Sequence, residues 1–477
     1  MQKRKKKQNC KTKVRCLVKI ISVILSCLMC SISFSGCMHN SVGEISDKTQ
    51  VSLGGYFTHA PVTERYEYDI RAVELFEELH PDTDIVDSGW FFTPDTYLAK
   101  AEGNTLPTIY YVPMTEAYNI IKQGYAADIT NEYMERGYYE HTRDFILENI
   151  SRDGKVYLIP TGIYDLGLFV NMSVYKEAGF VAEDGTPYQP QTWEETAELA
   201  KKIKDTTGNP GFVFPTGGRI AGWLFMPIAW SYGTVFEEYE DGKWQANFNS
   251  PECAAALQYI KNLKWKYDVL QDEDIKDSIE YRRYVAKNKS GFSITDEESV
   301  KRTIDHGIDR NDIGLVAMPA GSVRKVTLVG GGYNVINKDA TPEQIHAAMN
   351  WVEYERRPTK LTDVYKKKPD EQLVQYDKLG YIIGVESVGL WEGTAEAERY
   401  LKQKVNEMIN VNPNHIKQYN DKSTVEFKLE EPIEAQMLYE ILGNVINKVL
   451  TDENADPGEL LKEAAYEFQT KCLDYTN

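Results

Sequence analysis

Cysteine is scarce in the part of this chain that can fold. Beyond residue 37 only Cys253 and Cys472 remain, 219 residues apart. Two such distant cysteines cannot build the disulfide framework of a small secreted domain, so we expect two buried thiols. The sequence also lacks a histidine pair at metal-ligand spacing, a nucleophile elbow and a nucleotide-binding glycine fingerprint. We therefore expect no metal, no cofactor and no catalytic residue.

Basic residues are the second deficit. The chain has 54 Lys and Arg against 72 Asp and Glu, and nine of the 54 fall within residues 1–19. The residues after this segment therefore carry 45 basic and 72 acidic side chains, a formal charge of −27. Such a surface repels phosphate backbones, so we expect no nucleic-acid partner. It is equally unsuited to lying flat on anionic lipid.

Long hydrophobic runs are missing as well. The apolar stretch from Ile20 to Met29 is shorter than the roughly 20 residues that span a bilayer. Because it follows a basic segment and precedes small residues, residues 1–36 are predicted to be a signal peptide. Phe34-Ser35-Gly36-Cys37 resembles the lipobox of bacterial lipoproteins, although Phe34 stands where Leu is usual. An ordinary signal peptide or an N-terminal membrane anchor is the alternative.

The lipobox resemblance implies lipidation (a palmitate-type anchor) at Cys37 and attachment to the extracellular face of the cell membrane. Residues 37–49 are polar and without pattern, as expected of a flexible stalk. The 441 residues from Cys37 onward are enough for two or three domains with large cores.

Strand and helix patterns alternate along the rest of the chain, which predicts an α/β fold with a parallel or mixed sheet covered by helices. Thr192 followed by Glu195 is the pattern of a capping box at the start of a helix. The expected strands are 51–57, 83–86, 108–112, 166–170, 290–295 and 313–318. The expected helices are 68–79, 96–101, 117–123, 173–178, 192–204, 221–232, 251–267, 341–354, 432–449 and 458–468.

Two local motifs suggest roles beyond secondary structure. Gly330-Gly331-Gly332 does not have nucleotide-binding spacing, so we expect a close backbone approach or a hinge there. Trp223 and Trp230 are seven residues apart and share one helix face, so we expect one in the core and one lining a cleft.

Several segments, taken in order, resemble extracellular solute-binding proteins of the sugar-binding family that includes maltose-binding protein. The resemblance covers most of residues 50–350, and residues 355–430 match nothing that we can name. The segments that carry it are Leu106–Val112, Gly124–Thr130, Gly154–Pro160, Asn171–Gly179, Asn249–Leu263 and Gly332–Ile336.

The resemblance implies a two-lobed, periplasmic-binding-protein-like fold of type II, with a hinge and a ligand cleft between the lobes. It assigns residues 50–161 plus about 329–385 to the N-terminal lobe, and residues 162–328 plus about 386–477 to the C-terminal lobe. It also implies a monomer that delivers its ligand to the permease subunits of an ABC importer.

Candidate ligand contacts are aromatic rings, which stack on the C–H faces of sugars, and polar groups, which bind hydroxyls. Three of the candidates have an alternative to ligand binding. His59 could lie in a surface loop, Glu116 could be a solvated acid at a helix start, and Tyr333 could pack in the core. The candidates are Phe57, His59, Trp90, Thr115, Glu116, Tyr164, Asp165, Arg219, Trp223, Asp296, Tyr333 and Trp391.

The expected function is capture of a carbohydrate, in particular an oligosaccharide, by lobe closure. A receptor for a peptide or another polar solute is the nearest alternative. A secreted glycoside hydrolase would also be rich in tyrosine and tryptophan, and it would need two carboxylates across the scissile bond. A structural surface adhesin would bind no small molecule.

Overall fold

The computed structural model of the protein describes residues 48–56, 64–287, 289–301, 303–355 and 358–476. The predicted signal peptide, Cys37, nearly all of the stalk, Phe57 and His59 lie outside these ranges. Residues from Thr49 onward form one unit, which is described below.

Nine strands of the described residues form one mixed sheet, as the alternation of elements predicts. Its strands run in the order β2-β1-β3-β12-β6-β10-β7, with β13 also paired to β12 and β11 also paired to β6. The strands are β1 (Thr49–Gly54), β2 (Thr83–Asp87), β3 (Ile109–Pro113), β6 (Leu158–Asn171), β7 (Phe212–Val213), β10 (Phe292–Asp296), β11 (Ile313–Val316), β12 (Val326–Ile336) and β13 (Glu426–Leu429). Two small hairpins lie apart from it, β4 (Ser151–Arg152) with β5 (Lys155–Val156) and β8 (Glu237–Glu240) with β9 (Lys243–Ala246).

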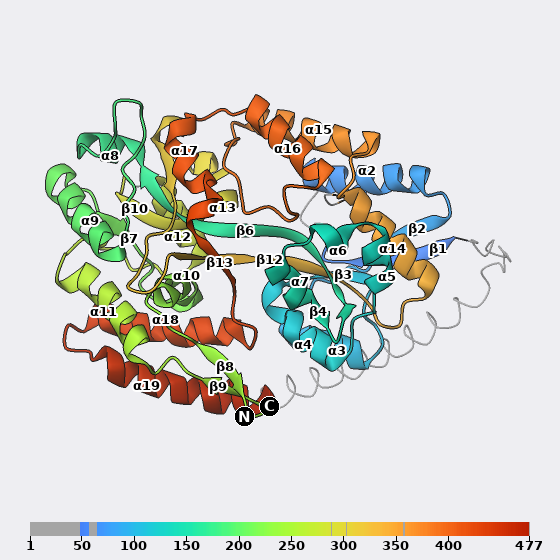
Figure 1. Cartoon of the computed structure of the whole chain (residues 1–477), viewed down its shortest axis with the longest axis horizontal. Helices are drawn as coiled ribbons and strands as arrows, with labels where there is room; N and C mark the ends of the chain where they lie inside the picture. Colours follow the sequence, from blue (N-terminus) through green and yellow to red (C-terminus); the bar gives the residue numbers. More distant parts are fainter. Residues whose placement is uncertain (1–47, 57–63, 288, 302, 356–357, 477) are drawn as a thin grey trace, which may run out of the picture. The chain divides into compact units, whose positions relative to one another are not determined.

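The long strands β6 and β12 run side by side, in opposite directions, between two groups of elements (Figure 1). Each group has its own hydrophobic core. The N-terminal core includes Leu53, Val112 and Ile163, and the C-terminal core includes Leu166 and Phe292. Because Ile163 and Leu166 belong to different cores, β6 passes from one core to the other within three residues.

The ten predicted helices begin and end within about four residues of their predicted bounds, and the described residues contain nine further helices that the sequence patterns did not predict. Up to residue 301 the helices are α2 (Glu64–Leu79), α3 (Pro94–Glu102), α4 (Ala117–Gln123), α5 (Thr130–Glu135), α6 (Tyr138–His141), α7 (Asp144–Ile150), α8 (Met172–Glu177), α9 (Trp193–Thr207), α10 (Gly218–Ser231), α11 (Pro251–Trp265), α12 (Ser278–Lys287) and α13 (Glu297–Lys301). The later ones are α14 (Pro342–Glu355), α15 (Asp363–Leu379), α16 (Glu396–Glu407), α17 (Pro413–Asn420), α18 (Ala435–Thr451), α19 (Pro457–Phe468) and α20 (Asp474–Thr476).

The start of α9 differs from the predicted capping box in one detail. The Thr192 side chain accepts a hydrogen bond from the Glu195 backbone N–H at 3.1 Å, as expected of an N-cap. The Glu195 carboxylate, however, accepts from the backbone N–H of Gln191 at 2.6 Å instead of that of Thr192. The helix therefore has its predicted cap, and its reciprocal bond is shifted by one residue.

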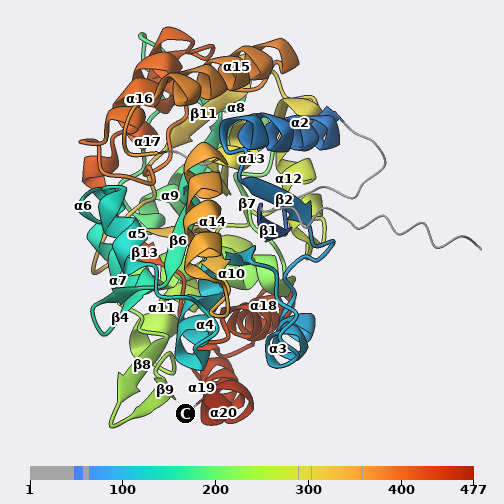
Figure 2. The same ribbon diagram turned by 90° about the vertical axis from the view of Figure 1, so that its right-hand side faces the viewer.

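The region without family resemblance, residues 355–430, is helical and packs beside the sheet. α15 and α16 lie side by side in both views (Figure 2). After them the chain returns through α17 to β13, which pairs in parallel with β12. This region therefore supplies a strand of the central sheet.

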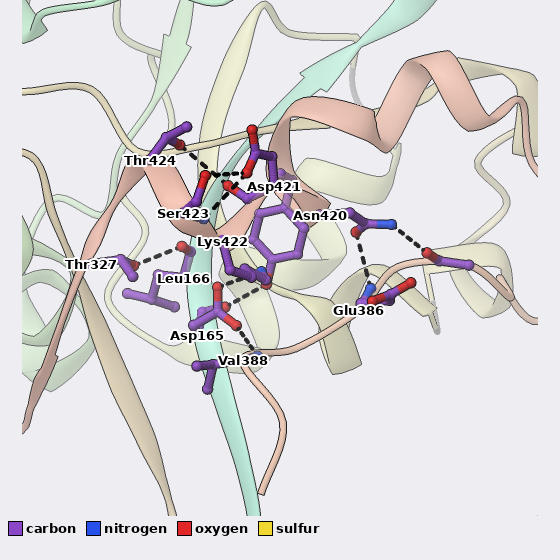
Figure 3. A network of polar contacts seen from close by, with 12 residues as sticks. Asp165, Leu166, Thr327, Glu386, Val388, Asn420, Asp421, Lys422, Ser423 and Thr424 are labelled. Atoms are coloured by element: carbon purple, nitrogen blue, oxygen red, sulfur yellow. Dashed lines mark hydrogen bonds and ion pairs between the residues drawn. The ribbon is translucent and has the colours of Figure 1, made fainter. Parts of the chain in front are cut away.

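A polar network fastens the same region to β6 (Figure 3). The Asp165 carboxylate, only 1% exposed, pairs with Lys422 Nζ at 2.7 Å and accepts the Val388 backbone N–H at 2.7 Å. The Tyr419 hydroxyl donates to the Asp165 carbonyl, and the Lys422 ammonium lies 3.2 Å from the centre of the Tyr419 ring. Asp165 stands where β6 changes cores, so this network holds the crossing in place.

Both cysteines of the folded part are free and buried, as the sequence predicts. Burial raises the pKa of the Cys253 thiol to about 12 and that of Cys472 to about 11. Neither thiol is therefore ionised near neutral pH, and both are packing residues.

Candidate functional site

A cavity of about 680 Å³ opens among α10, α12, β10, α13 and α18. Tyr164 on β6 and Glu430, just after β13, also line it. Four of the predicted site residues come together here: Tyr164, Arg219, Trp223 and Asp296. They arrive from three separate parts of the chain, which is typical of a binding site assembled by the fold.

Aromatic rings form one wall of the cavity around the carboxylate of Glu430. Trp223 and Tyr164 meet edge to face, with ring centroids 6.1 Å apart. Glu430 Oε1 accepts the indole N–H of Trp223 at 3.1 Å and the hydroxyl of Tyr439 at 2.8 Å. One carboxylate oxygen thus fixes two rings, and no described residue donates a hydrogen bond to Oε2.

The two tryptophans of α10 divide as their spacing predicts. Trp230 is fully buried in the C-terminal core, and Trp223 lines the cavity. Consecutive glutamates hold them, because the Trp230 indole donates to Glu431 Oε1 at 2.8 Å while Trp223 donates to Glu430. Lys428 neutralises Glu431 with an ion pair of 2.8 Å. The turn after β13 therefore sets the orientation of both rings.

Charged side chains of both signs surround the aromatic wall. Arg219 pairs with Glu440 at 3.0 Å, and Lys276 pairs with Asp274 at 2.8 Å. Asp296 accepts from the backbone N–H and the hydroxyl of Ser299, so it caps the start of α13. The cavity thus offers rings together with donors and acceptors, and no single charge sign dominates it.

Burial raises the pKa of Glu430 to about 7, against the lowering effect of its bonds from Tyr439 and Trp223. The folded protein therefore binds a proton that the unfolded chain releases between pH of about 4.5 and 7. Since the stabilising state is the protonated one, Glu430 contributes stability at low pH that is lost as the pH rises through this window.

We accordingly expect the unfolding free energy of wild type to include a component that falls between about pH 4.5 and pH 7, and Glu430→Gln to lack it. Urea unfolding at three pH values within this range measures the slope. The matched control is Glu371→Gln, which changes an exposed residue of α15 and should keep the wild-type slope. Identical slopes for Glu430→Gln and wild type would contradict the assignment.

Three predicted contacts on the N-terminal side lie away from the cavity. Trp90 packs edge-on against Tyr110, with centroids 5.7 Å apart, and its indole donates to Thr96. Thr115 is buried, and burial together with the nearby Glu434 raises the pKa of Glu116 to about 7. Trp90 is followed by Phe91 and Phe92, and of these three rings Phe91 is the exposed one, at 46%.

Asp165, Tyr333 and Trp391 are buried in this fold and do not line this cavity. The Asp165 carboxylate is bound to Lys422 and Val388 in the polar network described above. The Tyr333 side chain is fully buried and its hydroxyl donates to Asn149. Trp391 stacks on Tyr138 in the N-terminal core, with ring centroids 4.9 Å apart.

Glu430 and Tyr439 are the important site residues that the sequence analysis missed. Glu430 lies at the end of the region without family resemblance, and nothing in its local sequence distinguishes it from the neighbouring acids. Tyr439 lies in a predicted helix whose cavity-facing side cannot be recognised before the packing partner, α10, is known.

No group of three or more His, Cys, Asp and Glu among the described residues is arranged to hold a metal ion. Within the same residues, no helix has both the length and the apolar character of a membrane span.

Comparisons with solved structures show the fold. The maltose-bound MalE3 of T. maritima superposes with a TM-score of 0.62 at 19% identity, covering 88% of this chain and 99% of that one. A cyclic alpha-maltosyl-1,6-maltose binding protein from Arthrobacter globiformis gives 0.64 at 20%, covering 89% and 98%. UgpB from Mycobacterium tuberculosis, in complex with glycerophosphocholine, gives 0.61 at 12%, covering 85% and 95%.

These similarities identify the two-lobed, type II binding-protein fold that the sequence predicts. The ligands of these three proteins differ, so the fold alone does not fix what this chain binds. Residues 74–370, more than half of the chain, match the family of bacterial extracellular solute-binding proteins. The chain belongs to this family.

Proposed function

We propose that this protein binds a carbohydrate, in particular an oligosaccharide, without changing it chemically, and delivers it to an ABC importer. The observation that carries the proposal is the cavity whose wall consists of Trp223, Tyr164 and Tyr439 around Glu430. Sugar rings present flat C–H faces that stack on aromatic rings, and their hydroxyls require partners such as carboxylates and guanidinium groups. The cavity supplies both kinds of group.

The balance of charge favours a neutral ligand over a charged one. A charged solute requires a dominant group of opposite sign, whereas basic and acidic side chains both line this cavity. The solved relatives that bind maltose and a cyclic maltosyl-maltose support the same class. A peptide or another polar solute remains the alternative that the experiment must exclude.

We further propose that the receptor acts as a monomer, with a lipid on Cys37 and residues 37–49 as its stalk. The two hydrophobic cores support a division into lobes near residues 161 and 329. Closure of the lobes would be a population shift driven by contacts that only the closed form makes. The lipid would keep the loaded receptor beside the permease subunits.

A thermal-shift screen over oligosaccharides, peptides and other nutrients tests the proposal. A ligand at about 100 times its dissociation constant should raise the unfolding free energy by roughly 2.7 kcal/mol. The same mixtures are analysed for products by chromatography. Stabilisation by saccharides without products is the expected result, and turnover would instead indicate a glycoside hydrolase. Stabilisation by peptides alone would show that the ligand is a peptide and not a carbohydrate.

Trp223→Ala should weaken sugar binding at least tenfold, because it removes the largest stacking surface of the cavity. Isothermal titration calorimetry of wild type and variant with the best saccharide of the screen measures the change. Trp223→Phe keeps a ring but loses the bond to Glu430 and should show an intermediate loss. Tyr466→Ala, at a ring that is 73% exposed on α19, is the remote control. Unchanged affinity in Trp223→Ala would remove this cavity from the ligand site.

A further inference from the structure

Glu430 and Glu431 are consecutive glutamates that each hold a tryptophan, yet they differ in what neutralises them. Glu431 accepts the indole N–H of Trp230 at 2.8 Å and is paired with Lys428 at 2.8 Å. Glu430 accepts the indole N–H of Trp223 at 3.1 Å, and none of the described basic side chains forms an ion pair with it. The carboxyl group that is buried in the core thus has a counter-ion, whereas the one that lines the cavity has none.

The two oxygens of the Glu430 carboxyl group are unequally occupied. Oε1 accepts two hydrogen bonds, from the Trp223 indole and, at 2.8 Å, from the Tyr439 hydroxyl. Oε2 accepts none from the described residues, and Glu430 lines the cavity. A protonated carboxyl group carries its proton on the oxygen that is free of other donors, because that oxygen has room for an O–H. Neutral Glu430 therefore presents an O–H donor to the cavity at Oε2.

The groups around this carboxyl do not favour its charged form. Tyr164 on β6 and Tyr333 on β12 face it, and burial first and nearby negative charge second raise the pKa of both phenols. Asp296 on β10 adds negative charge on the far side of Tyr164. Arg219, the basic residue of α10 at this cavity, is paired with Glu440 on α18 at 3.0 Å. A negative charge at this position is therefore held by two hydrogen bonds alone.

We propose that the cavity binds its ligand with Glu430 in the neutral form, so that capture takes up a proton wherever this residue is ionised beforehand. The proton comes from the solvent and resides on Oε2, from which the O–H donates to a ligand oxygen. A sugar hydroxyl or ring oxygen supplies the lone pair that this bond requires. The inference rests on the proposed function, and it adds a proton to the binding reaction.

The direction of the pH dependence follows from burial. In the protein without ligand, burial already raises the pKa of Glu430 to about 7. A ligand that covers the aromatic wall excludes water from the same carboxyl group, which disfavours its charged form further and raises the pKa again. The affinity should therefore be constant well below pH of about 7, where both states are protonated, and should fall as the pH rises through this value.

Isothermal titration calorimetry with the best saccharide of the screen tests the proposal. Wild type should bind about tenfold more weakly at about pH 8.5 than at about pH 6. Titrations at about pH 7.5 in two buffers of different ionisation enthalpy should show that binding takes up a proton. Tyr439→Phe removes a hydrogen bond that favours the anion, so it should move the fall in affinity to higher pH. A residue that only supports the wall would not move this midpoint.

Glu430→Gln imitates the neutral acid, because its amide oxygen accepts the two ring bonds while its N–H group faces the cavity. It should bind saccharide with the same affinity at both pH values and take up no proton. Glu371→Gln, at an exposed residue of α15, is the matched control and should keep the pH profile of wild type.

The outcomes separate this inference from the proposed function. If no saccharide binds wild type, the proposed function fails. If saccharides bind wild type equally well at both pH values and without proton uptake, the inference is overturned while the function stands. A pH dependence that persists in Glu430→Gln also overturns it, because the proton then lies on another group. So does a folded Glu430→Gln that binds no saccharide, because the ligand then requires the ionised carboxylate.

Discussion

Asp165→Ala should lower the unfolding free energy by about 3–5 kcal/mol, because it leaves the ammonium of Lys422 in the interior without its partner. The two groups are 2.7 Å apart, and only 18% of the Lys422 side chain is exposed. The variant also leaves the backbone N–H of Val388 without its acceptor. Burial raises the pKa of Asp165 and lowers that of Lys422, so each charge depends on the other. Equilibrium unfolding in urea measures the loss.

Two further variants separate the charge from the geometry. Asp165→Asn keeps an acceptor for Val388 but removes the charge, and it should still be strongly destabilised. The double variant Asp165→Leu with Lys422→Met removes both charges and should recover a large part of the loss, because a buried ion pair is often no better than apolar groups of the same size. A double variant as unstable as the sum of its singles would show that the network matters through hydrogen bonds to the segment around Val388.

Local sequence signals predicted ten of the helices and six of the strands among the described residues, because the causes of these elements are local. The helix at 117–123 ends at Gly124, which takes a left-handed conformation with φ of 69°. α9 begins at the Thr192 cap, and α11 begins at Ser250 followed by Pro251. In each case a turn residue and the apolar spacing lie within a few positions of one another, and tertiary packing does not override them.

The site was only partly predictable because its geometry depends on residues far apart in the chain. The family resemblance pointed to Tyr164 and Asp165 together, yet neighbouring residues of a strand face opposite sides. Tyr164 therefore lines the cavity, while Asp165 turns to Lys422, which lies 257 positions later. A single sequence holds no signal that links Asp165 with Lys422. Glu430 was missed for the same reason, because its hydrogen-bond partner Trp223 lies 207 positions earlier in the chain.

The glycine run 330–332 was predictable in part, since its role was visible in the sequence but its contacts were not. Its composition alone predicts a close approach, because glycine is the residue that permits one. Which groups approach could come only from the register of β12 against β3 and β6. The structure shows that they are tyrosine rings for Gly330 and Gly332, and the backbone carbonyl of Gly162 for Gly331.

Gly222 allows α10 to pack closely against α18, the two helices that carry Trp223 and Tyr439 of the cavity wall. Gly222→Ala should lower the unfolding free energy by about 3 kcal/mol, because the added methyl group would lie 2.1 Å from the carbonyl oxygen of Tyr439. The obstacle is backbone, so no change of rotamer can relieve it and α10 must move away from α18. Alanine is favoured over glycine within a helix by about 1 kcal/mol, which opposes the clash but is smaller than it. Urea unfolding measures the net effect.

The same change should weaken saccharide binding at least tenfold, because Trp223 on α10 and Tyr439 on α18 share one oxygen of Glu430. Separating the helices breaks at least one of these bonds and turns a ring of the wall. Gly393→Ala is the matched control, since a methyl group there would meet nothing within 4 Å. If Gly222→Ala loses stability but binds saccharide like wild type, then the Trp223–Glu430–Tyr439 geometry does not determine affinity, and the ligand must be held by other residues.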